Sequence, residues 1–176
     1  DMEADIILKA DEIIKSSVDV DKSKILVVAG HEWHHGVIGI VASRITEKYY
    51  RPTILLTVED GVASGSARSV DGFSIFDALS SCKDLLNKFG GHEMAAGMSL
   101  DPANIEELSR RLNVYASEHM NEQTLIQKAK VEQRLTPSDI SVDFVESLSR
   151  LEPYGMGNEE PKFMIQGLID SLSLMG

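Results

Sequence analysis

Short apolar runs alternate with segments of helical periodicity, and this alternation constrains the fold more than any other feature of the chain. Ile25–Ala29 and Thr53–Val58 are continuous runs with the length of buried strands. Between them, Val37–Tyr49 has apolar residues at helical spacing, and Pro52 prevents this helix from continuing. The connection is long enough for a crossover between parallel strands, so an α/β arrangement follows.

The flanking sequence adds a hairpin and further helices. Asp60-Gly61 favours a tight turn between strands. Ser74 is suited to cap a helix, which we expect to continue to about Lys88 and to end at Gly90-Gly91. The predicted order is helix Ala4–Ser17, strand Ile25–Ala29, helix Val37–Tyr49, strands Thr53–Val58 and Val62–Ala67, the helix from Ser74, strand Met94–Leu100 and a helix after Asp101-Pro102. The predicted fold class is α/β, with a mixed sheet flanked by helices.

The pattern changes after about Met120. A polar connection is followed by a short helix within Thr136–Leu151, a turn-rich loop and the strand-like segment Lys162–Leu174. We therefore expect a connecting helix and linker over residues 1–20, a first domain over 21–128 and the beginning of a β domain over 129–176. The chain starts within a helical pattern and stops within a strand-like one, so we expect it to be cut from a longer protein.

The composition limits the possible functions. The net charge is −11, which argues against a broad basic groove along many phosphates but permits a local anion site. The lone Cys82, expected to be packed, favours a reducing, cytoplasmic setting. No apolar run has the length of a membrane span, so no membrane partner is expected. We expect a solvated surface at Asp1, Asp5, Asp11, Asp19 and Asp21.

The segment Trp33–Arg44 is the first that could carry chemistry. A polar aromatic loop containing His34 and His35 leads into a helix rich in small residues. The helix amides and the imidazoles could face an anionic ligand. Alternatively, the small residues serve tight packing and a histidine caps the helix. The histidines lack cysteine partners and the common zinc spacings, so no metal site is expected.

Two later segments offer hydrogen-bond donors in a small space. Gly65-Ser66-Ala67-Arg68-Ser69 has two hydroxyls and a guanidinium that could clamp a terminal phosphate. The alternative is a polar turn in which Arg68 pairs with a carboxylate. Gly90-Gly91-His92 could present an imidazole to a phosphoryl oxygen. The alternative there is a helix end with a half-buried histidine.

Together these motifs resemble the RecJ exonuclease branch of the DHH phosphoesterases. Trp33–Arg44 is similar to a hallmark of that branch, and the segments from Gly65 and from Gly90 resemble two motifs of its DHH-associated domain. Leu151–Asn158, with Pro161 and Phe163, resembles the entry to the oligonucleotide-binding (OB) domain that follows. The resemblance covers nearly the whole chain and implies an OB-like β domain, truncated here, over residues 129–176.

The resemblance also implies a role for each motif. His92 would contact the nucleotide being removed, as an auxiliary catalytic residue. The implied substrate-binding residues are Gly65, Ser66, Arg68, Ser69, Gly90, Gly91, Trp33, His34 and Arg44. His35 stands where proline is usual in the family, so we assign it no catalytic role.

The family cleaves single-stranded DNA with a 5′-phosphate from its 5′ end, in DNA repair and recombination. Its Mn²⁺ or Mg²⁺ ions are held by an Asp-His-His triplet and further aspartates of an N-terminal domain, which this chain lacks. We therefore expect no metal in this fragment and no activity from it alone. The implied partners are single-stranded DNA, the absent catalytic domain and single-stranded-DNA-binding protein. The alternatives are a related phosphodiesterase for short oligonucleotides or cyclic dinucleotides, and a non-catalytic nucleic-acid-binding scaffold.

Overall fold

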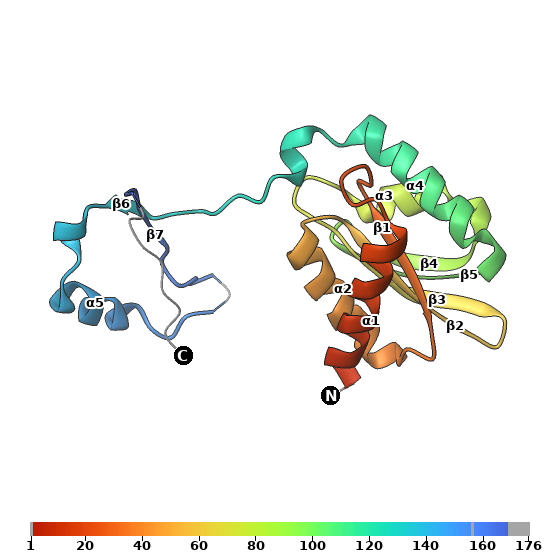
Figure 1. Ribbon diagram of the computed structural model, residues 1–176, viewed down its shortest axis with the longest axis horizontal. Coiled ribbons are helices and arrows are strands. Elements are labelled where there is room, and N and C mark those ends of the chain that lie inside the picture. Colours follow the sequence, from red (N-terminus) through yellow and green to blue (C-terminus); the bar gives the residue numbers. More distant parts are fainter. Residues whose placement is uncertain (1, 156, 169–176) are drawn as a thin grey trace. The chain divides into compact units, whose positions relative to one another are not determined.

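A computed structural model of the protein describes residues 2–155 and 157–168. The chain forms two compact units, residues 1–127 and 128–176. The first unit contains helices α1 (Met2–Ser17), α2 (His35–Tyr49), α3 (Ile75–Ser81) and α4 (Ile105–His119) (Figure 1). Its strands are β1 (Leu26–His31), β2 (Thr53–Glu59), β3 (Val62–Arg68), β4 (Leu86–His92) and β5 (Ala95–Leu100). Short 3-10 turns lie at Lys83–Leu85, Pro102–Asn104 and Glu122–Leu125.

The five strands form one mixed sheet in the order β1-β2-β3-β5-β4. β1 and β2 are parallel across the α2 crossover, and the other neighbouring pairs are antiparallel. The β2–β3 hairpin turns at Asp60 and Gly61, which both have positive φ, as the Asp-Gly pair favours. The predicted mixed sheet flanked by helices is confirmed.

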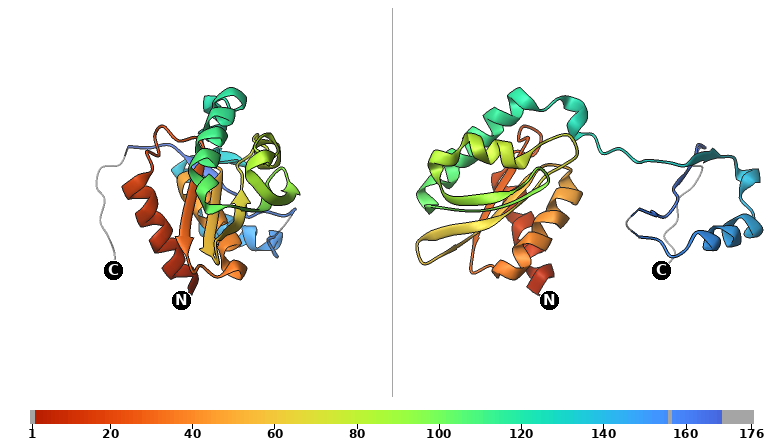
Figure 2. Two further views of the ribbon diagram at one scale, coloured as in Figure 1. Left: turned by 90° about the vertical axis from the view of Figure 1, so that its right-hand side faces the viewer. Right: turned by 180° about the vertical axis from the view of Figure 1, so that it is seen from behind.

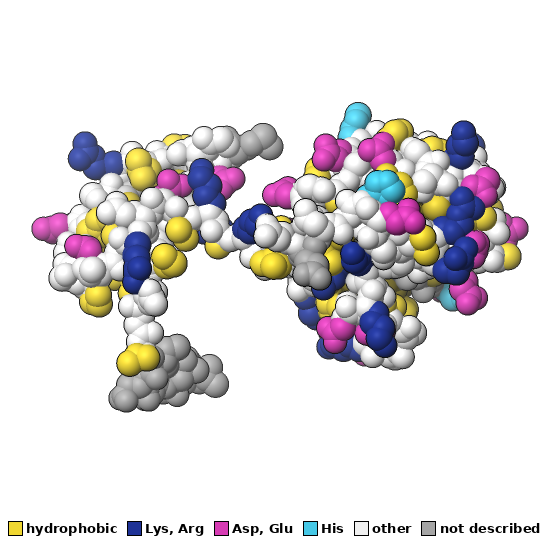
Figure 3. Space-filling model, turned by 90° about the horizontal axis from the view of Figure 1, so that it is seen from above, with side chains coloured by type: hydrophobic (Ala, Val, Ile, Leu, Met, Phe, Trp, Pro, Cys, Tyr) yellow, Lys and Arg dark blue, Asp and Glu magenta, His cyan; other side chains and the backbone are white. Residues whose placement is uncertain are grey.

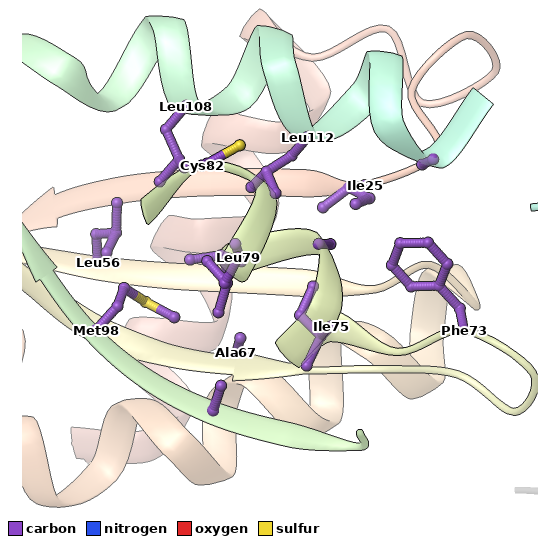
Figure 4. Close-up of a cluster of buried hydrophobic side chains, with 14 of the residues drawn as sticks. Ile25, Leu56, Ala67, Phe73, Ile75, Leu79, Cys82, Met98, Leu108 and Leu112 are labelled. Carbon is purple, nitrogen blue, oxygen red and sulfur yellow. The ribbon is translucent and has the colours of Figure 1, made fainter. Parts of the chain in front are cut away.

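Helices cover the two faces of the sheet unequally (Figure 2). On one face, α3 and α4 pack against residues of β2, β3, β5 and β4, in a core that includes Leu79, Met98 and Leu112 (Figure 4). On the other face, α1 and α2 pack against Leu26, Val28 and Leu55 of β1 and β2. Cys82 is buried in the first of these cores, so its predicted packing is confirmed.

The helix from Ser74 was predicted too long. Ser74 does cap it, since its hydroxyl accepts a hydrogen bond from the Asp77 amide at 3.2 Å, but the helix ends at Ser81. Arg111 of α4 terminates it by donating to the Ser81 carbonyl at 2.9 Å and to both Asp84 oxygens. The chain then enters β4, so Gly90 and Gly91 lie in a strand and do not end a helix. A contact from a distant helix thus overrides the local helical pattern.

Asp11 also departs from the prediction, because it is only 7% exposed. Its carboxylate accepts hydrogen bonds from Lys15 at 2.6 Å, from Lys48 and from the Tyr49 hydroxyl at 2.6 Å. These contacts join α1 to α2. Lys15, then Lys48 and Tyr49, hold the pKa of Asp11 well below its usual range, and burial together with Asp11 raises the pKa of Tyr49 to about 12.

The second unit has little regular structure among its described residues. It contains the parallel strands β6 (Gln133–Leu135) and β7 (Phe163–Ile165), helix α5 (Val142–Leu148) and 3-10 turns at Pro137–Asp139 and Ser149–Leu151. Phe144 of α5 packs edge-on against Phe163, with ring centroids 5.3 Å apart. The strand predicted over Lys162–Leu174 is described only to residue 168, and the remainder lies outside the described residues.

Candidate functional site

One face of β3, β5 and β4 is left open beyond α2. Because residues opposite each other in antiparallel strands point to the same face, the register aligns Ser66 with Gly97 and Gly90, and Arg68 with Ala95 and His92. Gly90, His92 and Gly97 are exposed on this face. Adjacent strands are about 4.8 Å apart, so Ser66 and Arg68 face Gly90 and His92 across one intervening strand of small residues. The structure therefore brings the two later motifs together.

Arg68 is the most constrained polar side chain of this face. Its Nη1 donates to the Ser66 hydroxyl and to the Ala67 carbonyl, both at 2.8 Å, and its Nε donates to the Ser43 hydroxyl of α2 at 3.1 Å. Gly39 of α2 lies directly beside it, since a Cβ at this position would be 3.0 Å from Nη2 of Arg68. The small residues of α2 thus allow the helix to approach and orient the guanidinium.

The alternative role for Arg68, pairing with a carboxylate, is absent from the described part of the chain. The sequence has 28 acidic residues, yet among residues 2–155 and 157–168 Arg68 forms no ion pair, and its Nη2 has no hydrogen-bond acceptor. An oriented guanidinium with a free edge and no counter-charge is suited to bind an anion such as phosphate.

The glycines of the two motifs have different roles. A Cβ at Gly65 would overlap the carbonyl oxygen of Leu55, so this glycine permits close pairing of β2 and β3. Gly91 has φ of 151°, and its Cβ would overlap the backbone of Ala95. A Cβ at Gly90 or Gly97 would have no atom within 3.4 Å, so these two glycines are not required by packing. Because they have no side chains, they leave the backbone of the open face uncovered.

His92 ends β4 at a hairpin that is fixed by two backbone hydrogen bonds. The Ser69 amide donates to the Met94 carbonyl at 2.9 Å, and the Ile75 amide donates to the Glu93 carbonyl at 3.0 Å. The Ser69 hydroxyl donates to the Phe73 carbonyl at 2.6 Å, and the side chain is buried. Ser69 therefore holds the hairpin that presents His92, with its own donors used inside the fold.

The residues of the first motif lie on several sides of α2. Trp33 is only 4% exposed and packs in the core beneath α1 and α2. His34 caps the helix, since its Nδ1 accepts from the Gly36 amide at 3.1 Å. His35 lies 3.6 Å from Glu59, and Arg44 faces Glu3 and Glu47 at 3.8 and 3.4 Å. Of this motif, Gly39 and Ser43 contact Arg68, whereas Arg44 does not point toward it.

The sequence interpretation missed two parts of this surface. It treated Ser43 only as a small packing residue, although the hydroxyl orients Arg68. It also placed Lys88 at a helix end, whereas Lys88 lies in β4 opposite Ser99. Phe89 was the sequence signal that could have indicated a strand here. It packs in the core, and its neighbours Lys88 and Gly90 therefore point to the opposite face.

Among residues 2–155 and 157–168, no three or more His, Cys, Asp or Glu side chains are grouped so that they could hold a metal ion. The side chains at the open face therefore do not provide the ligands that the metal ions of a metal-dependent nuclease require. Within the described part of the chain, no helix is long and apolar enough to cross a membrane.

Comparison with known proteins places this fold in a family. A family model described as the DHHA1 domain matches residues 22–118, which is more than half of the chain. The chain belongs to the DHHA1 domain family. After this DHHA1 domain, residues 131–176 match a model described as the RecJ OB domain. The chain thus corresponds to the DHHA1 and OB region of RecJ, as its motifs predicted.

The relatives of this DHHA1 chain are described as single-stranded-DNA-specific exonucleases RecJ. The Bacillus subtilis protein is 40% identical over 82% of this chain, and the Thermus thermophilus protein is 34% identical over 88%. The chain spans only 19% and 22% of these two proteins. A crystal structure of Thermus thermophilus RecJ in complex with Mn²⁺ is 32% identical, with a TM-score of 0.77, over 93% of this chain and 24% of that one.

Proposed function

We propose that this chain is the substrate-binding part of a RecJ-type 5′-to-3′ single-stranded DNA exonuclease that acts in DNA repair and recombination. Ser66 and Arg68 hold the 5′-terminal phosphate, and His92 contacts the terminal nucleotide across the open face. The observation that carries the proposal is the state of Arg68. It is oriented by Ser43, Ser66 and the Ala67 carbonyl and has no ion-pair partner among the described residues.

The other predicted site residues divide into groups. Gly90, together with Gly97 of β5, which was not a predicted site residue, leaves the face uncovered so that a nucleotide can approach. Gly65 and Gly91 allow close approach of neighbouring strands, and the buried Ser69 and Trp33 support the hairpin and the core. His34 and Arg44 are exposed at the start of α2 and on α2, and neither is in contact with Arg68.

We further propose that the chain alone binds and positions DNA without cutting it. The chain spans only 19% and 22% of the two relatives named above, and solved RecJ structures are described in complex with Mn²⁺ or Mg²⁺. A preceding catalytic domain would hold these ions and would be the partner that faces His92. Single-stranded-DNA-binding protein is a further proposed partner, and the lone buried Cys82 suits a cytoplasmic protein.

Fluorescence anisotropy tests the 5′-phosphate assignment. Labelled single-stranded DNA with a 5′-phosphate is compared with the same strand carrying a 5′-hydroxyl, at low salt. We expect the phosphate form to bind at least about tenfold more tightly, since hydrogen bonds to a charged group contribute about 1.5–3 kcal/mol. Arg68→Ala should abolish this preference. Arg110→Ala is the matched control, because Arg110 is an exposed arginine on α4 that pairs with Glu107.

Equal affinity for the two strands in the unaltered protein would contradict the proposal. A cyclic dinucleotide that competed as well as the 5′-phosphorylated strand would instead favour the alternative phosphodiesterase, because a cyclic molecule has no terminal phosphate.

A further inference from the structure

Lys88 extends the open face away from Arg68. It lies in β4 opposite Ser99, and Ser99 is opposite Ser64 of β3. This row is adjacent to the row of Ser66, Gly97 and Gly90. A register shift between Leu86 and Lys88 lets both Leu86 and Phe89 pack toward the core. Lys88 is therefore directed to the same face as Gly90 and His92, and it is exposed.

The charges of this face differ from those of the whole chain. The residues of the three strands that alternate onto it include one arginine, one lysine and one histidine but no acidic residue; they are Val62, Ser64, Ser66, Arg68, Lys88, Gly90, His92, Ala95, Gly97 and Ser99. In contrast, Lys and Arg side chains are interspersed with Asp and Glu on the face seen in Figure 3. In a chain of net charge −11, such a face is complementary to an anionic partner.

Lys88 has no ion-pair partner among residues 2–155 and 157–168, unlike Lys15 and Lys48, which both bind Asp11. Strand and residue spacings put its Cα about 12 Å from that of Ser66, two strands and one row away. At this separation an extended lysine side chain can reach either the phosphate held by Ser66 and Arg68 or the next phosphate of the strand, so ligands with one phosphate and with several phosphates must be compared. A lysine offers a flexible point charge that suits a backbone phosphate of variable position.

We propose that Lys88 binds a second phosphate of single-stranded nucleic acid, on the 3′ side of the phosphate held by Ser66 and Arg68. Gly90, Gly97 and Ser99 form the floor between the two phosphate positions. The inference rests on the proposed 5′-phosphate clamp and adds to it a dependence on strand length.

A length series tests the proposal with the 176-residue chain. The ligands are thymidine 5′-monophosphate, which has one phosphate, and 5′-phosphorylated oligothymidylates of increasing length. Lys88→Ala should leave affinity for the monophosphate unchanged and weaken oligonucleotide binding by up to about fivefold, the upper end of the range for one exposed charge pair. The slope of log affinity against log salt should also fall by about 0.7. Lys88→Arg should retain oligonucleotide affinity.

Lys83→Ala is the matched control, since Lys83 is an exposed lysine in the turn after α3. The proposal is overturned if the oligonucleotide affinity of Lys88→Ala equals that of the unaltered chain and of Lys83→Ala. Equal weakening for the monophosphate and the oligonucleotides also overturns it, because Lys88 would then act at the terminal phosphate. A different result would disprove the 5′-phosphate site of Ser66 and Arg68: Arg68→Ala would still prefer a 5′-phosphate over a 5′-hydroxyl.

Discussion

The two faces of β3, β5 and β4 differ although they are built from alternate residues of the same strands. Ala67 and Met98 are buried beneath α3 and α4 (Figure 4), as is Ala96, whereas Ser66, Gly97 and Gly90 lie on the open face. Because side chains alternate along a strand, each strand contributes one set of residues to stability and another to the site. Substitutions on the two faces should therefore change different properties.

The largest effect on stability is expected on the buried face. Leu79→Ala removes a fully buried side chain of α3, and this should lower the free energy of unfolding by about 2–5 kcal/mol. Urea unfolding followed by the fluorescence of Trp33, the single tryptophan, measures the change. Affinity of the folded protein for a 5′-phosphorylated strand should not change. A loss below 1 kcal/mol would mean that α3 contributes little to the core.

A somewhat smaller effect is expected where α1 and α2 cover the sheet. Asp11→Asn weakens charged hydrogen bonds from Lys15, Lys48 and Tyr49, which should cost about 1.5–3 kcal/mol at neutral pH. The pKa of Asp11 is depressed in the folded state. The ionised Asp11 carboxylate therefore stabilises the fold fully when the pH is above the pKa of Asp11 in the unfolded protein, about 4. This stabilisation is lost as the pH falls from there through the lower pKa of the folded state.

Urea unfolding of the unaltered protein and of Asp11→Asn at several pH values checks this expectation. The difference in unfolding free energy between them should be constant near neutral pH and should shrink below about pH 4. A difference that stayed the same at low pH would show that the effect arises from packing and not from the carboxylate charge.

The adjacent glycines of β4 provide a sharper comparison within one motif. Gly91→Ala forces a side chain into a φ of 151° and against Ala95, which should cost about 1–3 kcal/mol. Gly90→Ala places a methyl group on the open face, where nothing lies within 4 Å, and stability should change by less than about 0.5 kcal/mol. Thermal unfolding of the two variants compares them. Equal destabilisation would contradict the assignment of Gly90 to the open face.

The smallest effect is expected from Ser43→Ala on α2. Losing the hydrogen bond to Nε of Arg68 should change stability by about 1 kcal/mol or less. Affinity for a 5′-phosphorylated strand should fall by a few fold, and affinity for a 5′-hydroxyl strand should not fall. Anisotropy measures both values. A loss as large as that of Arg68→Ala would indicate that Ser43 contacts the phosphate itself and does not only orient Arg68.

The sequence predicted those parts of the fold that depend on local signals. The apolar runs of β1 and β2, the Asp60-Gly61 turn and the Ser74 cap each lie where predicted. The end of α3 was not predictable locally, because it depends on Arg111, which follows Ser81 by 30 residues. Missing β4 also concealed Lys88 and the open face, since both are defined by strand pairing.

The predicted site residues show the same division. Ser66, Arg68 and His92 could be selected from residue chemistry and from the family resemblance. The burial of Trp33 and Ser69 could not, because each depends on contacts made by other segments. Asp11 was missed for a similar reason, as its lysine and tyrosine partners on α2 are 37 and 38 residues away.

The most direct test of the open face is a nuclear magnetic resonance titration of the ¹⁵N-labelled chain with a 5′-phosphorylated oligothymidylate. We predict that the largest amide shift changes occur at Ser66, Arg68, Gly90, His92 and Gly97, with small changes along α4. A matched 5′-hydroxyl strand should give weaker changes at Ser66 and Arg68. Shift changes concentrated on α4 or in the second unit, with none at Arg68, would contradict the account.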